Sequence, residues 1–314
     1  MERIDKTVVA TAGTTATASG GDQDEVDLIP VRTYWMLVRQ RFLQHRLAVL
    51  ALFLMAFLVI LAVVVPTLTG EGYKATSLSK SMLGPSLATP LGTNQIGQDM
   101  FLRLTKALQT SLFIGFMAVA IIGVIGVTLG ALAGYYGGWV DNLIMRFVDV
   151  ILSLPVFFMI LIIVAVLGKG SALVVVIAIG LTGWTLACRL VRAEFLKLRE
   201  ADFVQAARAL GASNRRIIAR HILPAALAPV VVAATLGIAD SVVAEAALSF
   251  LGFGISPPEA SLGNLLKNFE EDLQVRPHLL VPPAVTIVLV VLAASFLGDG
   301  LRDALDPRQR VESK

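Results

Sequence analysis

The sequence predicts an all-α membrane protein with six transmembrane helices. The 314 residues are 56% hydrophobic and only 16% charged, and the mean hydropathy is +0.78. Soluble domains carry about 25% charged residues, so this composition is typical of a membrane protein. Several apolar runs reach the ~20 residues that a helix needs to cross about 30 Å of hydrocarbon. The Lys and Arg residues gather between alternate runs, which is the pattern of a multi-pass protein.

The chain begins with a polar stretch and then a single isolated span. Residues 1–30 are rich in Thr, Ala, Gly and Asp, so we expect a disordered cytoplasmic tail. Residues 31–46 place apolar side chains on one helical face and Arg on the others, which predicts an amphipathic helix in the membrane interface. Residues 47–66 form an apolar run too long for the core of a signal peptide, and we expect them to be a retained transmembrane anchor.

The second span follows an external segment, residues 67–110, which ends in a short amphipathic helix from Met100. Residues 111–134 form the span itself. Gly126, Gly130 and Gly134 recur in it at four-residue intervals, so one face allows close approach of another backbone. We favour close packing inside the bundle over a dedicated subunit interface.

The remaining spans alternate with short connections. A loop over 135–146 precedes a span over 147–167, which Pro155 should kink. After a glycine turn at 168–170, the expected segments are a span over 171–189, the polar stretch 200–224, a span over 225–250, an external segment to residue 278, a last span over 279–297 and a cytoplasmic tail over 301–314.

The polar, Arg-rich stretch 200–224 contains the most specific sequence signal. Asp202 and Gln205 have the spacing of a capping box, and the alanines that follow favour a helix of about eight residues. Gly211 can stop that helix because it adopts positive φ without strain. A second short helix should end before Pro224, since proline lacks the amide that a helix interior needs. The stretch therefore predicts two short helices joined at a glycine elbow.

This stretch resembles the EAA loop of ABC importer permeases, more narrowly that of the second permease subunit of dipeptide, oligopeptide and nickel importers. The matching residues are Gln205, Ala206, Ala207, Gly211, Ile222, Leu223 and Pro224. Gln205 stands where the family usually has Glu. Residues 248–252 and 298–307 resemble the family as well, so the likeness covers roughly 35–310. It implies a type I (MetI-like) permease fold, with a core over 111–300, and a cytoplasmic loop that docks into an ATP-hydrolysing subunit.

The distribution of positive charge gives an independent orientation. With both termini inside, the inner segments hold 6, 1, 8 and 4 of the 26 Lys and Arg residues. The positive-inside rule therefore predicts that the stretch 200–224 and both termini lie in the cytoplasm. The resemblance implies a bacterial-type cytoplasmic membrane.

The sequence lacks the motifs of an enzyme. It has no Gly-x-x-x-x-Gly-Lys-Ser/Thr phosphate loop, no His-Glu-x-x-His pair and no Gly-x-Ser-x-Gly elbow. The single Cys188 and three scattered histidines predict no metal site. We expect no cofactor in this chain. The resemblance implies ATP and Mg in two ATP-binding partner subunits, together with a homologous second permease and an extracytoplasmic substrate-binding protein. We expect no nucleic-acid partner.

Two other functions remain open alternatives at this stage. A proton-coupled secondary transporter would use buried acids as a relay and work without an ATPase, and an intramembrane aspartyl protease would need two facing aspartates. The EAA-like loop favours the permease. Peptide is the favoured cargo, and nickel chelates, glutathione and sugars stay possible cargoes.

The fifth span carries the candidate translocation residues. Ser241, Glu245 and Ser249 are four residues apart and share one helical stripe. We expect this stripe to line a hydrated path at the interface with the partner permease. Asp240 lies about 140° around the helix from Glu245, and we expect hydrogen bonds within the bundle to hold it. A charge that faces lipid costs at least ~2.5–3.5 kcal/mol, so neither acid should do so.

Overall fold

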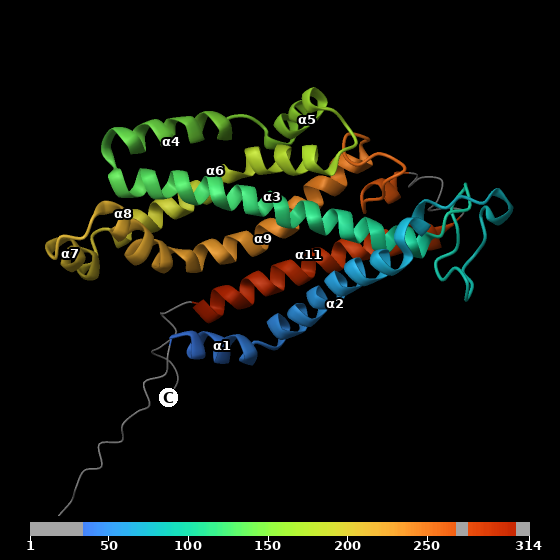
Figure 1. The fold of residues 1–314 in the computed structure, drawn as a ribbon, viewed down its shortest axis with the longest axis horizontal. Coiled ribbons are helices and arrows are strands. Elements are labelled where there is room, and N and C mark those ends of the chain that lie inside the picture. Colours follow the sequence, from blue (N-terminus) through green and yellow to red (C-terminus); the bar gives the residue numbers. More distant parts are fainter. Residues whose placement is uncertain (1–33, 268–275, 306–314) are drawn as a thin grey trace, which may run out of the picture.

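A computed structural model describes residues 34–267 and 276–305, and most of them are helical (Figure 1). Within these described residues, five helices are long and apolar enough to cross a membrane, and a bent helix pair makes a sixth span if it counts as one. The helices are α1 (Tyr34–Gln44), α2 (Arg46–Thr69), α3 (Met100–Tyr136), α4 (Gly138–Leu152), α5 (Val156–Leu167), α6 (Ala172–Leu198), α7 (Asp202–Ala209), α8 (Asn214–Arg216), α9 (Leu223–Phe250) and α11 (Pro277–Leu305).

The centre of the bundle is the long α3, which packs along α6 and α9 (Figure 1). Gly126, Gly130 and Gly134 face α6 so closely that side chains would not fit. A Cβ at Gly130 would lie 2.5 Å from the carbonyl oxygen of Cys188, and one at Gly134 would lie 2.6 Å from Cβ of Phe195. The glycine stripe therefore packs inside this subunit, as the sequence predicted.

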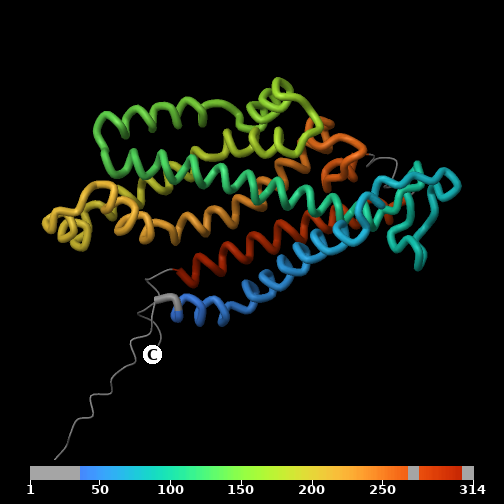
Figure 2. Tube along the Cα trace, in the orientation of Figure 1, coloured from blue at the N-terminus to red at the C-terminus, as the bar shows by residue number. Residues whose placement is uncertain are grey.

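The helices α2 and α11 form a second layer beside α9 (Figure 2). Their close approach again depends on a small residue, because a Cβ at Gly300 would lie 2.1 Å from Cβ of Ala48. Buried Met55, Leu58 and Val290 fill the space between this layer and α3. The outer face of α2 exposes large apolar side chains, which suits contact with lipid.

The third expected span is broken rather than kinked. The helices α4 and α5 meet at an angle of 87° on either side of Pro155. The expected loop over 135–146 is largely wrong, because α4 already begins at Gly138, directly after a tight turn with positive φ at Gly137 and Gly138. An ion pair between Arg192 and Asp141 then ties α4 to α6.

The second span also has different bounds from those expected. The short helix from Met100 and the span over 111–134 are one continuous helix of 37 residues. Its start is fixed by Asp99, whose carboxylate accepts hydrogen bonds from the amides of Phe101 and Leu102 at 2.8 and 3.3 Å. An Asp at the N-cap stabilises a helix by satisfying amides that have no partner in the first turn.

The two ends of the bundle differ in structure (Figure 1). At one end lie α7, α1 and the end of α11. At the other end, residues 70–99 and 251–267 form a compact region that we call the cap. Its polar centre is Gln98, which accepts a hydrogen bond from Arg103 at 2.7 Å. The expected tail over 1–30, most of the tail over 301–314 and the acidic stretch 268–275 lie outside the described residues.

Candidate functional site

The predicted glycine elbow is present, and we call residues 202–224 the knuckle. The helix α7 has 8 residues and ends at Ala209; Leu210 is its C-cap, and the following Gly211 has φ +80°. The amide of Gly211 donates to the carbonyl oxygen of Arg208 and that of Ala212 to Ala207, both at 3.0 Å. These two bonds form a Schellman motif, which satisfies the last carbonyl groups of a helix and requires positive φ at the glycine. The predicted role of Gly211 is therefore confirmed as local geometry.

The knuckle presents apolar side chains to the outside. Leu210 is 89% exposed and Phe203 is 45% exposed, and Ala206 lies between them on the same surface. Ala207 points inward and is 9% exposed. Exposed large apolar groups around a helix end are typical of a surface that another protein covers.

Fully buried side chains fix the knuckle to the bundle. Val204, Ile217 and Ile222 have no exposed surface and pack with Val191 and Phe195 of α6. The knuckle is therefore packed directly against α6 and continues into α9.

The expected capping box is wrong. Ala201, not Asp202, is the N-cap of α7, and no side chain caps it. Asp202 is instead the first helical residue, where its negative charge still favours the helix dipole. The side-chain amide of Gln205 reaches back past Asp202 and donates to the carbonyl oxygen of Arg199 at 3.3 Å. An amide can donate this bond and a carboxylate cannot, so Gln205 holds the α6–α7 turn in a way that Glu would not.

The expected helix end before Pro224 is also wrong. The chain continues as helix from Asn214 to Phe250, with a π-helical turn over Ile217–Ile222. Leu223 closes that turn by donating to the carbonyl oxygen of Ile218, five residues earlier. The wider turn accommodates the ring and missing amide of Pro224, which would disrupt regular α-helix. The knuckle thus joins α9 without a break.

The candidate translocation stripe is buried in this conformation. Ser241, Glu245 and Ser249 are 2, 0 and 1% exposed. One carboxylate oxygen of Glu245 accepts from Ser111 of α3 and the other from Ser249, each at 2.6 Å. Of the three, Ser241 borders the groove described below. The hydrated surface that we expected for Glu245 is therefore absent in this conformation. A transport role for the stripe stays a prediction.

Glu245 instead holds the cap to the spans. The hydroxyl of Ser249 accepts from the amide of Ile255 at 3.0 Å, and that of Ser111 accepts from the amide of Leu262 at 3.2 Å. Both serines bond to the same carboxylate, so α3, α9 and the cap segment meet at one buried acid. Such a fully satisfied network fixes one arrangement because breaking any member leaves a buried polar group unpaired.

The other acid of α9 has the opposite environment. Asp240 is exposed and makes no hydrogen bond or ion pair with the residues that the structure describes. The bonds that we expected to hold it within the bundle are therefore contradicted. It borders a groove of about 420 Å³ between α3, α5, α6 and α9.

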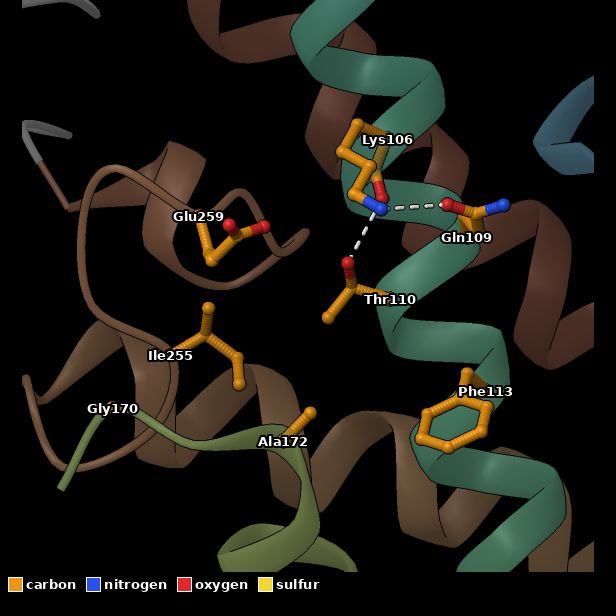
Figure 3. Close-up of a pocket in the computed structure, with 8 residues that line it drawn as sticks. All are labelled: Lys106, Gln109, Thr110, Phe113, Gly170, Ala172, Ile255 and Glu259. Carbon is orange, nitrogen blue, oxygen red and sulfur yellow. Dashed lines mark hydrogen bonds between the residues drawn. The ribbon is translucent and has the colours of Figure 1, made fainter. Parts of the chain in front are cut away.

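A second cavity, of about 410 Å³, lies at the cap end (Figure 3). Lys106 and Gln109 of α3 line one side, with a bond of 2.8 Å between them, and Glu259 faces them from the cap. Burial alone would raise the pKa of Glu259, but hydrogen bonds from Tyr73 and Lys74, at 2.8 and 3.0 Å, outweigh it and lower the pKa. Glu259 therefore carries a negative charge at neutral pH.

Two family models match the chain. The binding-protein-dependent transport system inner membrane component matches residues 126–311, and the N-terminal TM domain of oligopeptide transport permease C matches residues 33–88. The first match contains the knuckle, both acids of α9 and all the groove-lining residues except Val119, Ile122 and Gly123 of α3. The chain belongs to the binding-protein-dependent transport permease family. It is a membrane-spanning permease subunit of an ABC importer.

Several relatives of this permease are similar over most of their length. It is 39% identical over 276 residues to a dipeptide transport system permease of Alkalihalophilus pseudofirmus, covering 88% of this chain and 90% of that protein. It is 40% identical over 282 residues to a glutathione transport system permease of Escherichia coli, covering 88% and 92%. It is 38% identical over 276 residues to an oligopeptide transport system permease of Mycobacterium tuberculosis, covering 87% and 94%.

A solved structure supports the fold of this permease. An inward-facing form of the MetNI methionine ABC transporter has a chain that matches with a TM-score of 0.54 and 22% identity, covering 66% of this permease and 98% of that chain. The likeness confirms the predicted MetI-like fold. The sequence alone did not reveal that Asp240, rather than Glu245, borders the groove. The small residues Gly237 and Ala244, three and four residues from Asp240, were the signal that a cavity lies on that face.

Proposed function

We propose that this permease moves peptides across a bacterial-type cytoplasmic membrane and receives the energy of ATP through the knuckle. The observation that carries the proposal is the exposed apolar tip of the knuckle, Leu210 with Phe203, on a body anchored by fully buried side chains. A rigid element of this kind can transmit the closure of an ATPase subunit into the spans. The peptide cargo rests on the relatives, whose names specify dipeptides, oligopeptides and glutathione.

The proposed assembly has a homologous second permease, two ATP-binding subunits and an extracytoplasmic substrate-binding protein. The knuckle and both termini would lie in the cytoplasm, because 19 of the 26 Lys and Arg residues belong to segments on that side. The cap would then face the binding protein. ATP and Mg would be bound by the partner ATPase subunits, and this chain itself would hold no cofactor.

The buried Glu245 and exposed Asp240 also suit an ion-coupled transporter, because intramembrane acids can relay protons. An ion-coupled transporter works without an ATPase subunit, so it would not account for an exposed apolar knuckle at the end of the spans. Gln205 fits the coupling proposal, since its amide braces the α6–α7 turn without any charge.

The test is uptake of a labelled dipeptide by proteoliposomes. The complete complex with its binding protein should accumulate the dipeptide when ATP is present and should not respond to a proton gradient. This chain alone should show no uptake with either energy source. Uptake by the chain alone, driven by a proton gradient, would refute the proposal and favour the secondary transporter.

A further inference from the structure

The groove between α6 and α9 lies at mid-depth of the spans and is nearly free of charge. Asp240 is its one charged lining residue among those that the structure describes. Asp240 is ten residues before Phe250, the end of a helix of 28 residues, so it lies about 15 Å inside that end. The walls are largely small or aliphatic side chains from α3, α5, α6 and α9, among them Ile122, Ile160, Gly183, Leu186, Gly237 and Ala244.

The groove exists because small residues line the same stripe of α9 as the acid. Gly237, Asp240, Ser241 and Ala244 follow the three- and four-residue spacing of one helical face. Gly183 of α6 also borders the groove, and a Cβ there would lie 2.7 Å from the Ile122 side chain of α3. The volume of about 420 Å³ is within the range of about 300–1,000 Å³ that holds small ligands.

The polar groups of the groove leave the carboxylate of Asp240 without a partner in the described chain. The hydroxyl of Thr182, which lines the groove, donates to carbonyl oxygens of its own helix, those of Ala178 and Ile179, at 2.9 and 3.1 Å. An unpaired acid at this depth cannot face hydrocarbon without a large cost, so its exposed surface must meet water or a cation. Glu245, the other acid of α9, cannot take this role here because both of its oxygens are occupied.

We propose that Asp240 and the groove around it bind the protonated amino group of the transported peptide. This inference rests on the peptide function proposed above and adds the residue that recognises the cargo inside the membrane. A single negative charge in an apolar groove complements a molecule with one cationic end and apolar flanks, which is the N-terminal end of a peptide. The ammonium group donates to the carboxylate, and the first side chains contact the aliphatic walls. Blocking the amino group with an acetyl group removes both the charge and two donors.

The experiment measures binding in the groove directly, without the binding protein and its own selectivity. Ala244→Cys, in a Cys188→Ala background, places a thiol in the groove one turn from Asp240. A water-soluble maleimide should label it in the purified complex. Alanyl-alanine should slow the labelling at about tenfold lower concentration than N-acetyl-alanyl-alanine, which is the difference between a charge-assisted and a neutral hydrogen bond. In Asp240→Asn the two peptides should protect equally.

Val243→Cys provides the matched control, because Val243 is 48% exposed on the same helix but does not line the groove. Neither peptide should change its labelling. Three results would overturn the inference: no labelling at Ala244→Cys, equal protection by both peptides with Asp240 present, or loss of the second permease from the complex in Asp240→Asn. The last result would assign Asp240 to an ion pair between subunits.

ATP-driven uptake of alanyl-alanine by the complete complex separates this inference from the proposed function. Uptake without selective protection leaves the peptide function intact and removes only the role of Asp240. No uptake of any peptide removes both.

Discussion

Replacing Glu245 with Ala should release the cap from the spans. The change leaves the hydroxyls of Ser111 and Ser249 without their acceptor, and these serines are 0 and 1% exposed. A buried polar group left unsatisfied costs about 1–3 kcal/mol, so the two together cost about 2–6 kcal/mol. Because 1.4 kcal/mol is a factor of ten, local opening of the cap should become at least about 30-fold easier.

Hydrogen–deuterium exchange of the purified complex measures this opening. The amides of Ile255 and Leu262, which bond to the two serines, should lose at least about 30-fold of their protection in Glu245→Ala. Glu245→Gln keeps the shape and two polar atoms, so it should lose less than about tenfold. Asp240→Ala removes an acid without hydrogen bonds from the same helix and should leave the protection of the cap unchanged. Wild-type exchange in Glu245→Ala would refute the anchoring role of this acid.

Two further predictions concern packing and pH. Gly130→Ala should lower the thermal midpoint of the complex, because the new Cβ would lie 2.5 Å from the Cys188 carbonyl oxygen. Gly123→Ala is the control: its new Cβ would meet open space, so the better helix propensity of Ala should raise the midpoint slightly. Equal midpoints for the two variants would contradict the close packing of α3 and α6. The lowered pKa of Glu259 means that its bonds to Tyr73 and Lys74 are complete above the ordinary value of 4.5 and are lost only as the pH falls further. The difference in thermal midpoint between wild type and Glu259→Gln should therefore be constant from pH 7 to 4.5 and shrink below it, and a difference that already vanishes at pH 6 would contradict the shift.

The features that the sequence predicted well depend on local chemistry or on composition. The apolar runs define the spans because the hydrocarbon thickness fixes their length. The glycine stripe from Gly126 predicted close helix contact, and Gly211 predicted the elbow, because in each case the missing Cβ decides the geometry. Pro155 marked the break in the third span, and the structure adds the 87° angle between α4 and α5.

The features that the sequence did not predict depend on contacts between segments that are distant along the chain. Helical spacing correctly separated Asp240 and Glu245 onto different faces, but it did not show which face meets α3. Ser111, 134 residues away along the chain, decides that Glu245 is buried. Pro224 predicted a helix end by its local preference, and a π-helical turn overcame that preference because Ile217 and Ile222 gain burial by continuing the helix.

The central claim is that the exposed tip of the knuckle couples this permease to ATP hydrolysis, and one comparison tests it directly. Leu210→Asp places a charge on a side chain that is 89% exposed, so the chain itself should fold normally. A charge desolvated without a partner in an interface is strongly unfavourable, so docking of the ATPase should weaken. Peptide-stimulated ATP hydrolysis by the reconstituted complex should fall to the unstimulated level in Leu210→Asp and stay near the wild-type rate in Leu210→Met. Full stimulation in Leu210→Asp would contradict coupling through the knuckle.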